Sequence, residues 1–600
     1  MEDVMTGYNG VILRVNLTEK TIQKEKLDLE IAKKFIGGRG LGTKLYVDEV
    51  APEVDALSPD NKIMIATGPL TGTFTPTGGR YMVITKSPLT GTIASSNSGG
   101  RWGAELKFAG YDVIILEGKS ESPVYLSIKD EIVELKPADH LWGKLTTECT
   151  QKLQEIEGDK VKVLNIGPAG ERLSNIAAIM NDIDRAAGRS GVGAVMGSKN
   201  LKAIVVKGTH KVEIADNDSL KELVKKLQIK IKENGVTGQG LPTYGTAVLV
   251  NIINENGVFP TNNFQLSQFD KAEDISGETM AEKYLVKKKA CFSCPIACGR
   301  HVKMDKEEVG GPEYETVWGF GGDCGINDME AVIKANYWCN EMGLDTISAS
   351  ATIAAAMELY QHGKISKEQT GAVELTWGNS EAIVEWIKKM GLREGLGDDL
   401  AMGSWRLAEK YGMPEVSMTV KKQEIPAYDP RGIKGQGLAY ATSNRGGCHV
   451  RAYLISPEIL ALPEKLDKFS YENKAFWVKI FQDLTASIDS LGMCLFTSFA
   501  LNADDYASLY SLVTGYAMTQ QDVLDAGDRI WNIERLYNQA AGIDPGQDTL
   551  PVRLLNDPIP EGPAKGHIHE LDKLLGEYYF LRGWDENGIP KIDKLKVLGL

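Results

Sequence analysis

The stretch Ala290-Cys291-Phe292-Ser293-Cys294-Pro295-Ile296-Ala297-Cys298-Gly299 holds three cysteines in the spacing C-x2-C-x3-C. Thiolates this close on one short loop can face a single metal centre, because thiolate is the usual protein ligand of iron–sulfur clusters and of zinc. A zinc site usually adds a second close pair of ligands, whereas only the isolated His301 follows here. The spacing therefore favours an iron–sulfur cluster over two alternatives, structural zinc and buried reduced thiols.

A fourth cysteine stands far downstream, at the end of Asp489-Ser490-Leu491-Gly492-Met493-Cys494. An iron–sulfur cluster can take its last ligand from such a distance, so Cys494 is the predicted fourth ligand. Asp489 precedes it by five residues, which limits their separation to about 18 Å even in a fully extended chain. Whatever Asp489 binds therefore lies near the cluster.

The segment that ends in Cys494 has a counterpart earlier in the chain. Residues 331–339 and 481–488 both have helical patterns, and each leads into a segment with glycine at its fourth position. Those segments are Asn340-Glu341-Met342-Gly343-Leu344-Asp345 and the one that begins at Asp489. Glycine ends a helix because it readily adopts a left-handed conformation. Two matching segments predict two similar ligands; the alternative is a pair of ordinary glycine-terminated helices.

The composition is that of a globular protein, and its 600 residues are enough for roughly three or four domains. A net charge of −14 and the lack of a long basic cluster argue against nucleic acid as a partner. The N-terminus lacks a secretory signal and no run of eighteen apolar residues occurs, so we expect a cytoplasmic protein without a membrane partner. The remaining cysteines are read as reduced, mostly buried thiols: Cys149, Cys324, Cys339 and Cys448.

The chain changes from strand patterns to helix patterns near residue 210. Short β-type runs recur up to that point, and the first of them, residues 11–17, breaks at Thr18-Glu19-Lys20 as a hairpin does. Helical spacing dominates after Asp216, and a stretch rich in Pro and Gly at residues 425–432 indicates a further boundary. We therefore predict an α+β protein in which an N-terminal β-sheet domain forms a base for a cofactor and two mainly helical domains follow. The predicted domains are residues 1–210, 211–420 and 421–600.

Glycine-rich loops that contain arginine lie between the predicted strands: Thr77-Gly78-Gly79-Arg80, Asn97-Ser98-Gly99-Gly100-Arg101 and residues 184–193. Glycine lets the backbone approach a ligand closely and arginine matches the geometry of phosphate, so these loops suit a phosphorylated cofactor. Each loop alone is also compatible with an ordinary turn, and none is a nucleotide-binding fingerprint. The turns Gly68-Pro69-Leu70-Thr71-Gly72 and Ser87-Pro88-Leu89-Thr90-Gly91 echo each other, which predicts two similar units in this domain.

Together with Glu105-Leu106-Lys107-Phe108-Ala109-Gly110-Tyr111-Asp112 and Asn444-Arg445-Gly446-Gly447-Cys448-His449, these motifs resemble those of the tungsten-containing aldehyde:ferredoxin oxidoreductases. The resemblance runs nearly from end to end. In that family one tungsten is held by the dithiolene sulfurs of two pterins, without a protein ligand, beside a four-iron cluster. A β domain forms the base for the pterins and two helical domains cover them. The resemblance thus implies a tungsten bis-molybdopterin, a [4Fe-4S] cluster and Mg²⁺ as cofactors here.

The resemblance also implies roles for individual residues. The cluster ligands would be Cys291, Cys294, Cys298 and Cys494. Asn97 and the backbone of Ala186 would support a magnesium ion that bridges the pterin phosphates. The residues implied to bind the cofactor are Arg80, Asn97, Gly99, Arg185, Ala186, Gly188, Asn340, Gly343, Leu344, Asp345, Arg451, Asp489, Gly492, Met493 and Leu495.

The sequence departs from the family pattern at two places. Asn340 stands where aspartate is typical, so an amide replaces one hydrogen-bond acceptor of the first pterin. Some relatives carry an E-x-x-H motif that binds a metal at a dimer interface, and Lys334 and Tyr337 occupy those positions here. A metal-bridged dimer is therefore not expected, whereas another homodimer or a complex with an iron–sulfur subunit is compatible with the sequence.

Oxidation of an aldehyde to an acid takes an oxygen from water and removes two electrons, and it needs a base and a hydrogen-bond donor beside the substrate. The candidates are Glu315, in Gly311-Pro312-Glu313-Tyr314-Glu315, and His449. Without the resemblance, the sequence favours a salt-bridged or surface carboxylate for Glu315 and a hydrogen-bonded interior histidine for His449. With the family's site mapped onto them, both are predicted to be catalytic.

The implied activity is oxidation of aldehydes, with electrons passed through the cluster to ferredoxin or a similar acceptor. Lys287-Lys288-Lys289 is either a docking site for such an acidic partner or a solvated face. Competing hypotheses are a relative that reduces aromatic thioesters or oxidises sugar-phosphate aldehydes, a cluster-only electron-transfer subunit, and a zinc-stabilised interaction protein. The paired glycine segments argue against the electron-transfer subunit, since they predict two further ligands.

Overall fold

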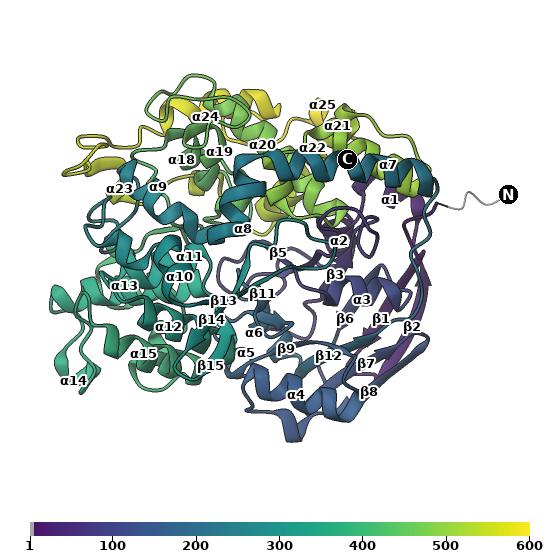
Figure 1. Ribbon diagram of the computed structural model, residues 1–600, viewed down its shortest axis with the longest axis horizontal. Helices are drawn as coiled ribbons and strands as arrows, with labels where there is room; N and C mark the ends of the chain where they lie inside the picture. Colours follow the sequence, from purple (N-terminus) through teal and green to yellow (C-terminus); the bar gives the residue numbers. More distant parts are fainter. Residues whose placement is uncertain (1–4) are drawn as a thin grey trace.

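The computed structural model describes residues 5–600, and its strands are concentrated in the first third of the chain. The last strand of that part, β12 (Leu201–Lys207), is followed by the long helix α7 (Asn217–Glu233), and helices dominate from there on. Figure 1 shows the strand-rich part, in purple and blue, at the lower right and the helices to its left and above it. The predicted α+β class is therefore confirmed, whereas the domain boundaries at residues 210 and 420 stay predictions.

The strand-rich part contains two six-stranded sheets with the orders β2-β1-β6-β3-β4-β5 and β8-β7-β12-β9-β10-β11. The first sheet comprises β1 (Val11–Asn16), β2 (Thr21–Lys26), β3 (Ile63–Thr67), β4 (Tyr81–Lys86), β5 (Ile93–Ser98) and β6 (Val113–Glu117). The second adds to β12 the strands β7 (Val124–Lys129), β8 (Ile132–Pro137), β9 (Lys162–Ile166), β10 (Ile179–Asn181) and β11 (Arg185–Ala187). The predicted hairpin is present as the antiparallel pair β1 and β2.

The two sheets repeat one topology, since raising each strand number of the first order by six gives the second order. In both sheets the first and last strands of the repeat pair in parallel, β1 with β6 and β7 with β12. Two similar units are therefore present, but the turns that suggested them are not equivalent. Gly68 follows β3 and Ser87 follows β4 of the same sheet, and the true counterpart of Gly68-Pro69 is Gly167-Pro168, which follows β9.

The central strands of the two sheets are buried on both faces, which explains their nearly continuous apolar sequences, whereas the edge strands β2 and β8 are largely exposed. One buried cluster contains side chains of both sheets, among them Leu13, Val83, Ile114, Leu126, Ile166 and Ile204. Helix α2 (Gly38–Glu49) packs on the other face of the first sheet, and α4 (Thr146–Glu157) packs on the other face of the second. The sheets thus form a rigid double base.

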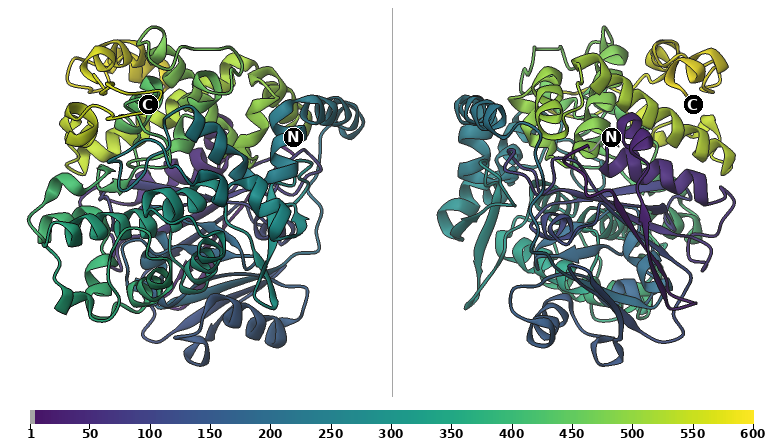
Figure 2. Two further views of the ribbon diagram at one scale, coloured as in Figure 1. Left: turned by 60° about the vertical axis from the view of Figure 1, so that its left-hand side comes forward. Right: turned by 90° about the vertical axis from the view of Figure 1, so that its right-hand side faces the viewer.

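Two helices of the remaining chain end on this base. They are α12 (Met329–Met342) and α20 (Lys474–Leu491), and α22 (Gln520–Ala540) packs along α20. Both views in Figure 2 place the C-terminal helices, in light green and yellow, at the opposite end of the molecule from the blue strands of the second sheet. Among residues 5–600, no helix combines the length and apolar character that a membrane crossing requires.

The helical part also contains a small sheet that the sequence did not predict. It consists of β13 (Leu285–Lys289), β14 (Gly299–Met304) and β15 (Glu307–Gly310), all antiparallel. The cysteine motif is the connection between β13 and β14, so the three cysteines are presented on a hairpin loop. The lysine run lies on β13, where three consecutive lysines give no alternation of apolar and polar side chains and hence no clear strand pattern.

Candidate functional site

The four predicted cluster cysteines come together at the junction of the base and the helical part. Cys291, Cys294, Cys298 and Cys494 line one small cavity of about 20 Å³, which Thr77, Gly79, Arg80 and Gly99 complete. A Cβ atom on Gly99 would lie 3.0 Å from Cys291 Sγ, so glycine lets the first sheet approach the thiols closely. Across residues 5–600, no three His, Cys, Asp or Glu side chains were found grouped for a single metal ion. The four thiols surround a space instead.

Arginine side chains face the cysteine cavity. Arg80 donates a hydrogen bond from Nη2 to Cys494 Sγ at 3.0 Å. Burial lowers the pKa of Arg80, but three of the cysteines raise it to a value well above the usual one. Burial likewise lowers the pKa of Arg185, and Cys291 and nearby carboxylates raise it above its usual range. Two arginines thus supply positive charge where thiolate ligands of a cluster would bring negative charge.

A larger cavity of about 450 Å³ begins beside Cys291 and Cys298 and runs between the base and the helical part. Most residues predicted for the cofactor line it, although they come from segments far apart in sequence. They are Arg80, Gly99, Arg185, Ala186, Gly188, Asn340, Leu344, Asp345 and Leu495, and Glu315 and His449 line the same cavity. The other predicted residues are not part of its lining; they are Asn97, Gly343, Arg451, Asp489, Gly492 and Met493.

The two matching segments are the C-termini of α12 and α20, each of which ends in a left-handed glycine. Gly343 has φ 71° and Gly492 has φ 84°, which only glycine adopts readily. Both helices extend further than predicted, so Asn340 and Asp489 lie in their last turns. Each half of the base contacts one of these helix ends through a glycine. A Cβ atom on Gly68 would lie 2.2 Å from the Leu491 carbonyl, and one on Gly167 would lie 2.3 Å from Met342 O.

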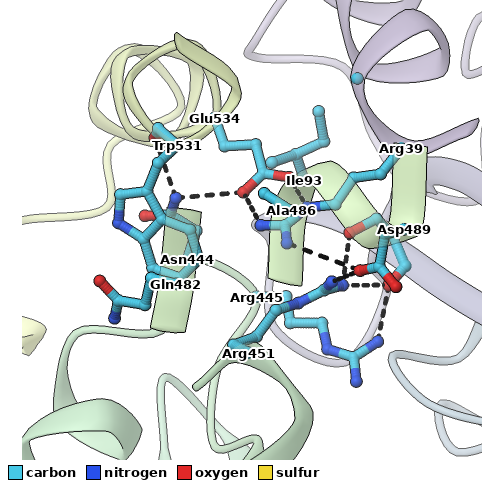
Figure 3. A network of polar contacts seen from close by, with 12 residues as sticks. Arg39, Ile93, Asn444, Arg445, Arg451, Gln482, Ala486, Asp489, Trp531 and Glu534 are labelled. Carbon is cyan, nitrogen blue, oxygen red and sulfur yellow. Dashed lines mark hydrogen bonds and ion pairs between the residues drawn. The ribbon is translucent and has the colours of Figure 1, made fainter. Parts of the chain in front are cut away.

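Asp489 lies at the centre of a buried polar network (Figure 3). Its Oδ2 accepts a hydrogen bond from Arg451 Nη1 at 2.8 Å, and its Oδ1 accepts one from Asn97 Nδ2 at 3.2 Å. Arg39 Nη1 lies 3.7 Å from the same Oδ2 while the rest of the Arg39 guanidinium holds Glu534 with two hydrogen bonds of 2.7 Å. Asp489, Asn97 and Arg451, which were predicted separately, thus form one connected unit.

The segment Gly37-Gly38-Arg39-Gly40 was missed by the sequence analysis. A Cβ atom on Gly38 would lie 2.3 Å from Asp489 O, so this glycine lets α2 touch the end of α20. The sequence does carry a signal for this segment, because its glycines flank an arginine, as they do in the three glycine-rich loops predicted to bind the cofactor.

The predicted catalytic pair is close together. Glu315 belongs to α11 (Tyr314–Trp318) and His449 to a short turn of helix at His449–Arg451. Glu315 Oε1 lies 3.5 Å from His449 Nε2, while Oε2 accepts a hydrogen bond from Ala427 N at 3.0 Å. Among the described residues, Glu315 Oε1 and His449 Nδ1 have no hydrogen-bond partner. Both residues line the cavity, and these two buried atoms are left unpaired.

Burial sets the protonation of this pair. It raises the pKa of Glu315 to about 8, although the Ala427 N–H and Arg189 act in the opposite direction. Burial also lowers the pKa of His449 well below its usual value, and the positive charges of Arg189 and Arg445 lower it further. At neutral pH both side chains are therefore largely uncharged. Displaced pKa values of this kind, in a cavity, are typical of functional sites.

An aromatic wall completes the cavity and was not predicted. Tyr314, Tyr428, Tyr453 and Phe499 line it, and the hydroxyl groups of Tyr428 and Tyr453 are 2.8 Å apart. The rings of Tyr428 and Tyr453 each lie with their centroids 6.1 Å from the ring of His449. These residues come from separate loops and helices, so no periodic pattern in the sequence marks them.

The surroundings of the lysine run differ from a simple solvated face. Lys287 forms an ion pair of 2.5 Å with Glu308, and Lys289 forms one of 2.6 Å with Asp184. His301, the isolated candidate zinc ligand, turns its ring nitrogens to the same two carboxylates, Glu308 and Asp184. His301 is thus engaged in ion pairs on the small sheet.

Four cysteines around one cavity, next to a second cavity that Glu315 and His449 line, are typical of a redox metalloenzyme. Sequence comparison agrees with this class. The profile of the aldehyde ferredoxin oxidoreductase N-terminal domain matches residues 12–208, and that of domains 2 and 3 matches residues 222–600. The chain belongs to the aldehyde ferredoxin oxidoreductase family.

Relatives match the chain over its full length. It is 56% identical over 602 residues to the tungsten-containing aldehyde ferredoxin oxidoreductase of Pyrococcus furiosus, with 99% of each chain covered. It is 52% identical over 601 residues to the enzyme of the same name from Thermococcus kodakarensis, again with 99% of each covered. Among solved structures, the active-site complex BamBC of benzoyl-coenzyme A reductase matches with a TM-score of 0.87 and 25% identity. That match covers 99% of this chain and 97% of the other.

Proposed function

We propose that this protein oxidises aldehydes to carboxylic acids at a tungsten bis-molybdopterin and passes the electrons through a [4Fe-4S] cluster to ferredoxin. The observation that carries the proposal is the continuity between the cysteine cavity and the cavity that holds Glu315 and His449. Cys291 and Cys298 line both cavities, so a cluster held there adjoins whatever occupies the larger space. Tungsten, when bound, would polarise the aldehyde carbonyl as a Lewis acid and accept two electrons.

The chain fits two pterin groups of similar shape. Its base is a tandem repeat, and each half receives one helix that ends in a left-handed glycine. Asn340 and Asp345 would hold one pterin, and Asp489 with Arg451 would hold the other. The two sites are not electrostatically equal, because Asp489 is surrounded by arginines and Asn340 is uncharged. Arg80 and Arg185, which lie between the cysteines and the larger cavity, suit the negative charges of the cluster and the phosphates.

The magnesium hypothesis is only partly compatible with the geometry. The side-chain oxygen of Asn97 accepts a hydrogen bond from Arg80 Nη1 at 2.8 Å, and its amide nitrogen donates to Asp489. An oxygen bound to a guanidinium is a poor ligand for a second cation. A magnesium ion at this place would therefore rely on backbone oxygens, as proposed for Ala186, and on the phosphates.

Glu315 and His449 would handle the protons of the reaction. The conversion of an aldehyde and water to an acid releases two electrons and two protons. Glu315, as the carboxylate, would accept a proton from the attacking water, because the residue lines the cavity and its Oε1 has no hydrogen-bond partner among the described residues. Neutral His449 would hold the substrate oxygen by a hydrogen bond from its ring. The aromatic wall excludes water from the other side and would position the substrate.

Ferredoxin, named in the titles of the relatives, is the proposed electron acceptor. Docking at the lysine run is a weaker proposal, since two of its three lysines already pair with carboxylates of this chain. The cluster-ligand loop itself reaches the surface, because Pro295 is exposed. A homodimer or a complex with an iron–sulfur subunit also stays a proposal.

The experiment is a metal analysis joined to a substrate panel, with protein purified without oxygen from its native host. We expect about one tungsten and about four iron per chain, and reduction of a viologen dye with aldehydes. The structural likeness to benzoyl-coenzyme A reductase makes aromatic thioesters the control substrates, and sugar-phosphate aldehydes complete the panel. Turnover with thioesters and none with simple aldehydes would overturn the proposed substrate class. If the metal analysis finds iron without tungsten or molybdenum, the protein is an electron carrier and not an aldehyde oxidoreductase.

A further inference from the structure

Four arginines are buried between the base and the helical part, next to the proposed pterin sites. Arg39, Arg189, Arg445 and Arg451 are at most 6% exposed. A buried cation is costly unless an anion lies beside it, so each of the four is expected to have one. Three have a carboxylate partner: Arg39 with Glu534 at 2.7 Å, Arg451 with Asp489 at 2.8 Å and Arg189 with Asp345 at 3.2 Å.

Arg445 is the exception. Within residues 5–600 it forms no ion pair with a carboxylate, and it is not part of the lining of the large cavity. Its Nη1 donates to Ser95 O at 2.6 Å, its Nε has no partner among the described residues, and its Nη2 points at Cys448 Sγ at 2.9 Å. Figure 3 shows Arg445 beside Arg451 and Asp489, so the carboxylate nearest to it is already engaged. The sulfur of Cys448 is therefore the remaining group that can supply a negative charge beside Arg445.

We propose that Cys448 is a thiolate, the counter-ion of Arg445, and that its negative charge opposes the ionisation of Glu315 in the neighbouring cavity. Cys448 directly precedes His449, whose Nε2 lies 3.5 Å from Glu315 Oε1, so the charge on the sulfur lies close to that carboxyl group. Cys448 is then a positioning residue, since it acts through Arg445 and through Glu315 and does not line the cavity. The first half of this proposal is independent of the proposed function, and the second half rests on it.

The charges around the sulfur agree with this assignment. Besides Arg445, the charged and titratable groups that interact electrostatically with Cys448 include Arg39, Arg189, Arg451, Glu315 and Tyr440, and His449 is its neighbour in the chain. Burial raises the pKa of Cys448, but Arg445, Arg451 and Arg189 outweigh it and bring the pKa below the usual thiol value. The other buried cysteines outside the cluster motif behave in the opposite way. Burial raises the pKa of Cys149 to about 11 and also raises the pKa values of Cys324 and Cys339.

The holoenzyme should therefore contain three S–H groups. Eight cysteines are present; four would bind the cluster and Cys448 would be ionised, which leaves Cys149, Cys324 and Cys339. The S–H stretching band in the infrared lies in a region free of protein absorption, so these groups can be counted directly at neutral pH. The wild-type spectrum decides the point once the intensity of one thiol is known: intensity for three thiols is expected, and intensity for four would overturn the proposal.

Matched variants assign the missing group. In a difference spectrum between wild type and Cys149→Ser, one S–H band should disappear, which fixes the intensity of one thiol. Between wild type and Cys448→Ser no S–H band should disappear. Loss of a band of the Cys149 intensity from Cys448→Ser would show a neutral thiol and overturn the assignment. Because the wild-type count needs only the Cys149→Ser calibration, the test holds even where Cys448→Ser does not fold.

The effect on Glu315 is read from the pH dependence of aldehyde oxidation with a viologen acceptor. Removal of a nearby negative charge eases the ionisation of a carboxyl group. In Cys448→Ser the rising limb of the plot of rate against pH should therefore move by about one pH unit toward lower pH. Cys448→Asp restores an anion beside Arg445 and should return the limb to within a few tenths of a pH unit of the wild-type position. An unmoved limb in Cys448→Ser would overturn this half. Absence of any aldehyde oxidation would instead refute the proposed function and leave the infrared result intact.

Discussion

Glu315 Oε1 lies 3.5 Å from His449 Nε2, and the two residues come from segments 134 positions apart. The pKa of the carboxyl group is raised to about 8 by burial, and the pKa of the imidazole is lowered well below its usual value, again by burial. Near pH 7 the pair therefore consists mostly of a protonated acid and a neutral ring. A small rise in pH converts the acid to a base without charging its neighbour.

Replacement of Glu315 by glutamine should remove the proton acceptor and keep the shape of the side chain. We expect the turnover number to fall by about 10²- to 10⁴-fold, the usual contribution of a general base. Tungsten and iron content should stay at wild-type values. The matched control is Asp323→Asn, because Asp323 is also fully buried with a raised pKa but does not line the cavity. Full activity in a metal-replete Glu315→Gln variant would refute the role.

The rate of aldehyde oxidation should rise with pH and level off above about 8, the pKa of Glu315. A base works only after it has lost its proton, so below that pKa the active fraction increases about tenfold for each pH unit. His449 contributes no second limb in this range, because its pKa lies well below 6.5 and it stays neutral. The measurement is kcat with a viologen acceptor between pH 6 and 9. A rate that falls over this interval would contradict the assignment, and the residual rate of Glu315→Gln should not follow the limb.

The sequence contained more of the site than of the fold around it. Cys494 and Asp489 could be linked to the cluster because chain length limits their separation, and both indeed lie at the same helix end. Covalent distance is a constraint that sequence carries directly. Contacts between segments that are far apart in the chain are not carried by the sequence in this direct way. Arg39 lies 450 residues from Asp489 in the chain, yet it borders that carboxylate in the fold.

The aromatic wall of the cavity could not be predicted from the sequence for a different reason. Tyr314 lies on the short helix α11, and Tyr428 and Tyr453 lie in two separate loops, so none of them belongs to a segment long enough for a periodic pattern. The strand β13 was not predicted for a related reason, since Lys287, Lys288 and Lys289 do not alternate between apolar and polar side chains. Its pairing with β14 and the ion pairs of Lys287 and Lys289 stabilise it instead.

Each of the four clustered cysteines should be required for iron binding. In Cys494→Ser the hydroxyl group is a poorer iron ligand than thiolate, and Arg80 loses its sulfur acceptor at 3.0 Å. We expect less than half of the wild-type iron and acid-labile sulfide, and loss of the paramagnetic signal of the reduced cluster. The control is Cys324→Ser, a buried thiol outside the cluster motif, which should keep its iron. Equal iron in both variants would remove Cys494 from the ligand set.

The tandem base should be as important for the proposed pterin sites as the residues that line them. Gly68 and Gly167 occupy equivalent turns, and each touches the backbone at the end of one helix, α20 or α12. A methyl group on Gly68 would lie 2.2 Å from the Leu491 carbonyl, and one on Gly167 would lie 2.3 Å from Met342 O. Neither backbone can yield without moving its helix end, so Gly68→Ala and Gly167→Ala should each destabilise the fold by about 1–3 kcal/mol or more.

The two substitutions should also lower the tungsten content, because a displaced helix end carries Asp489 or Asn340 with it. Gly576→Ala is the matched control, since nothing lies within 4 Å of the added methyl group in α24 (Asp572–Arg582). Alanine is favoured over glycine by about 0.5–1 kcal/mol inside a helix, so the control should keep or gain stability. Thermal unfolding and metal analysis of the three variants make the comparison. Normal tungsten in both Gly68→Ala and Gly167→Ala would mean that the helix ends do not hold the cofactor, because a shift forced on either one would then leave binding untouched.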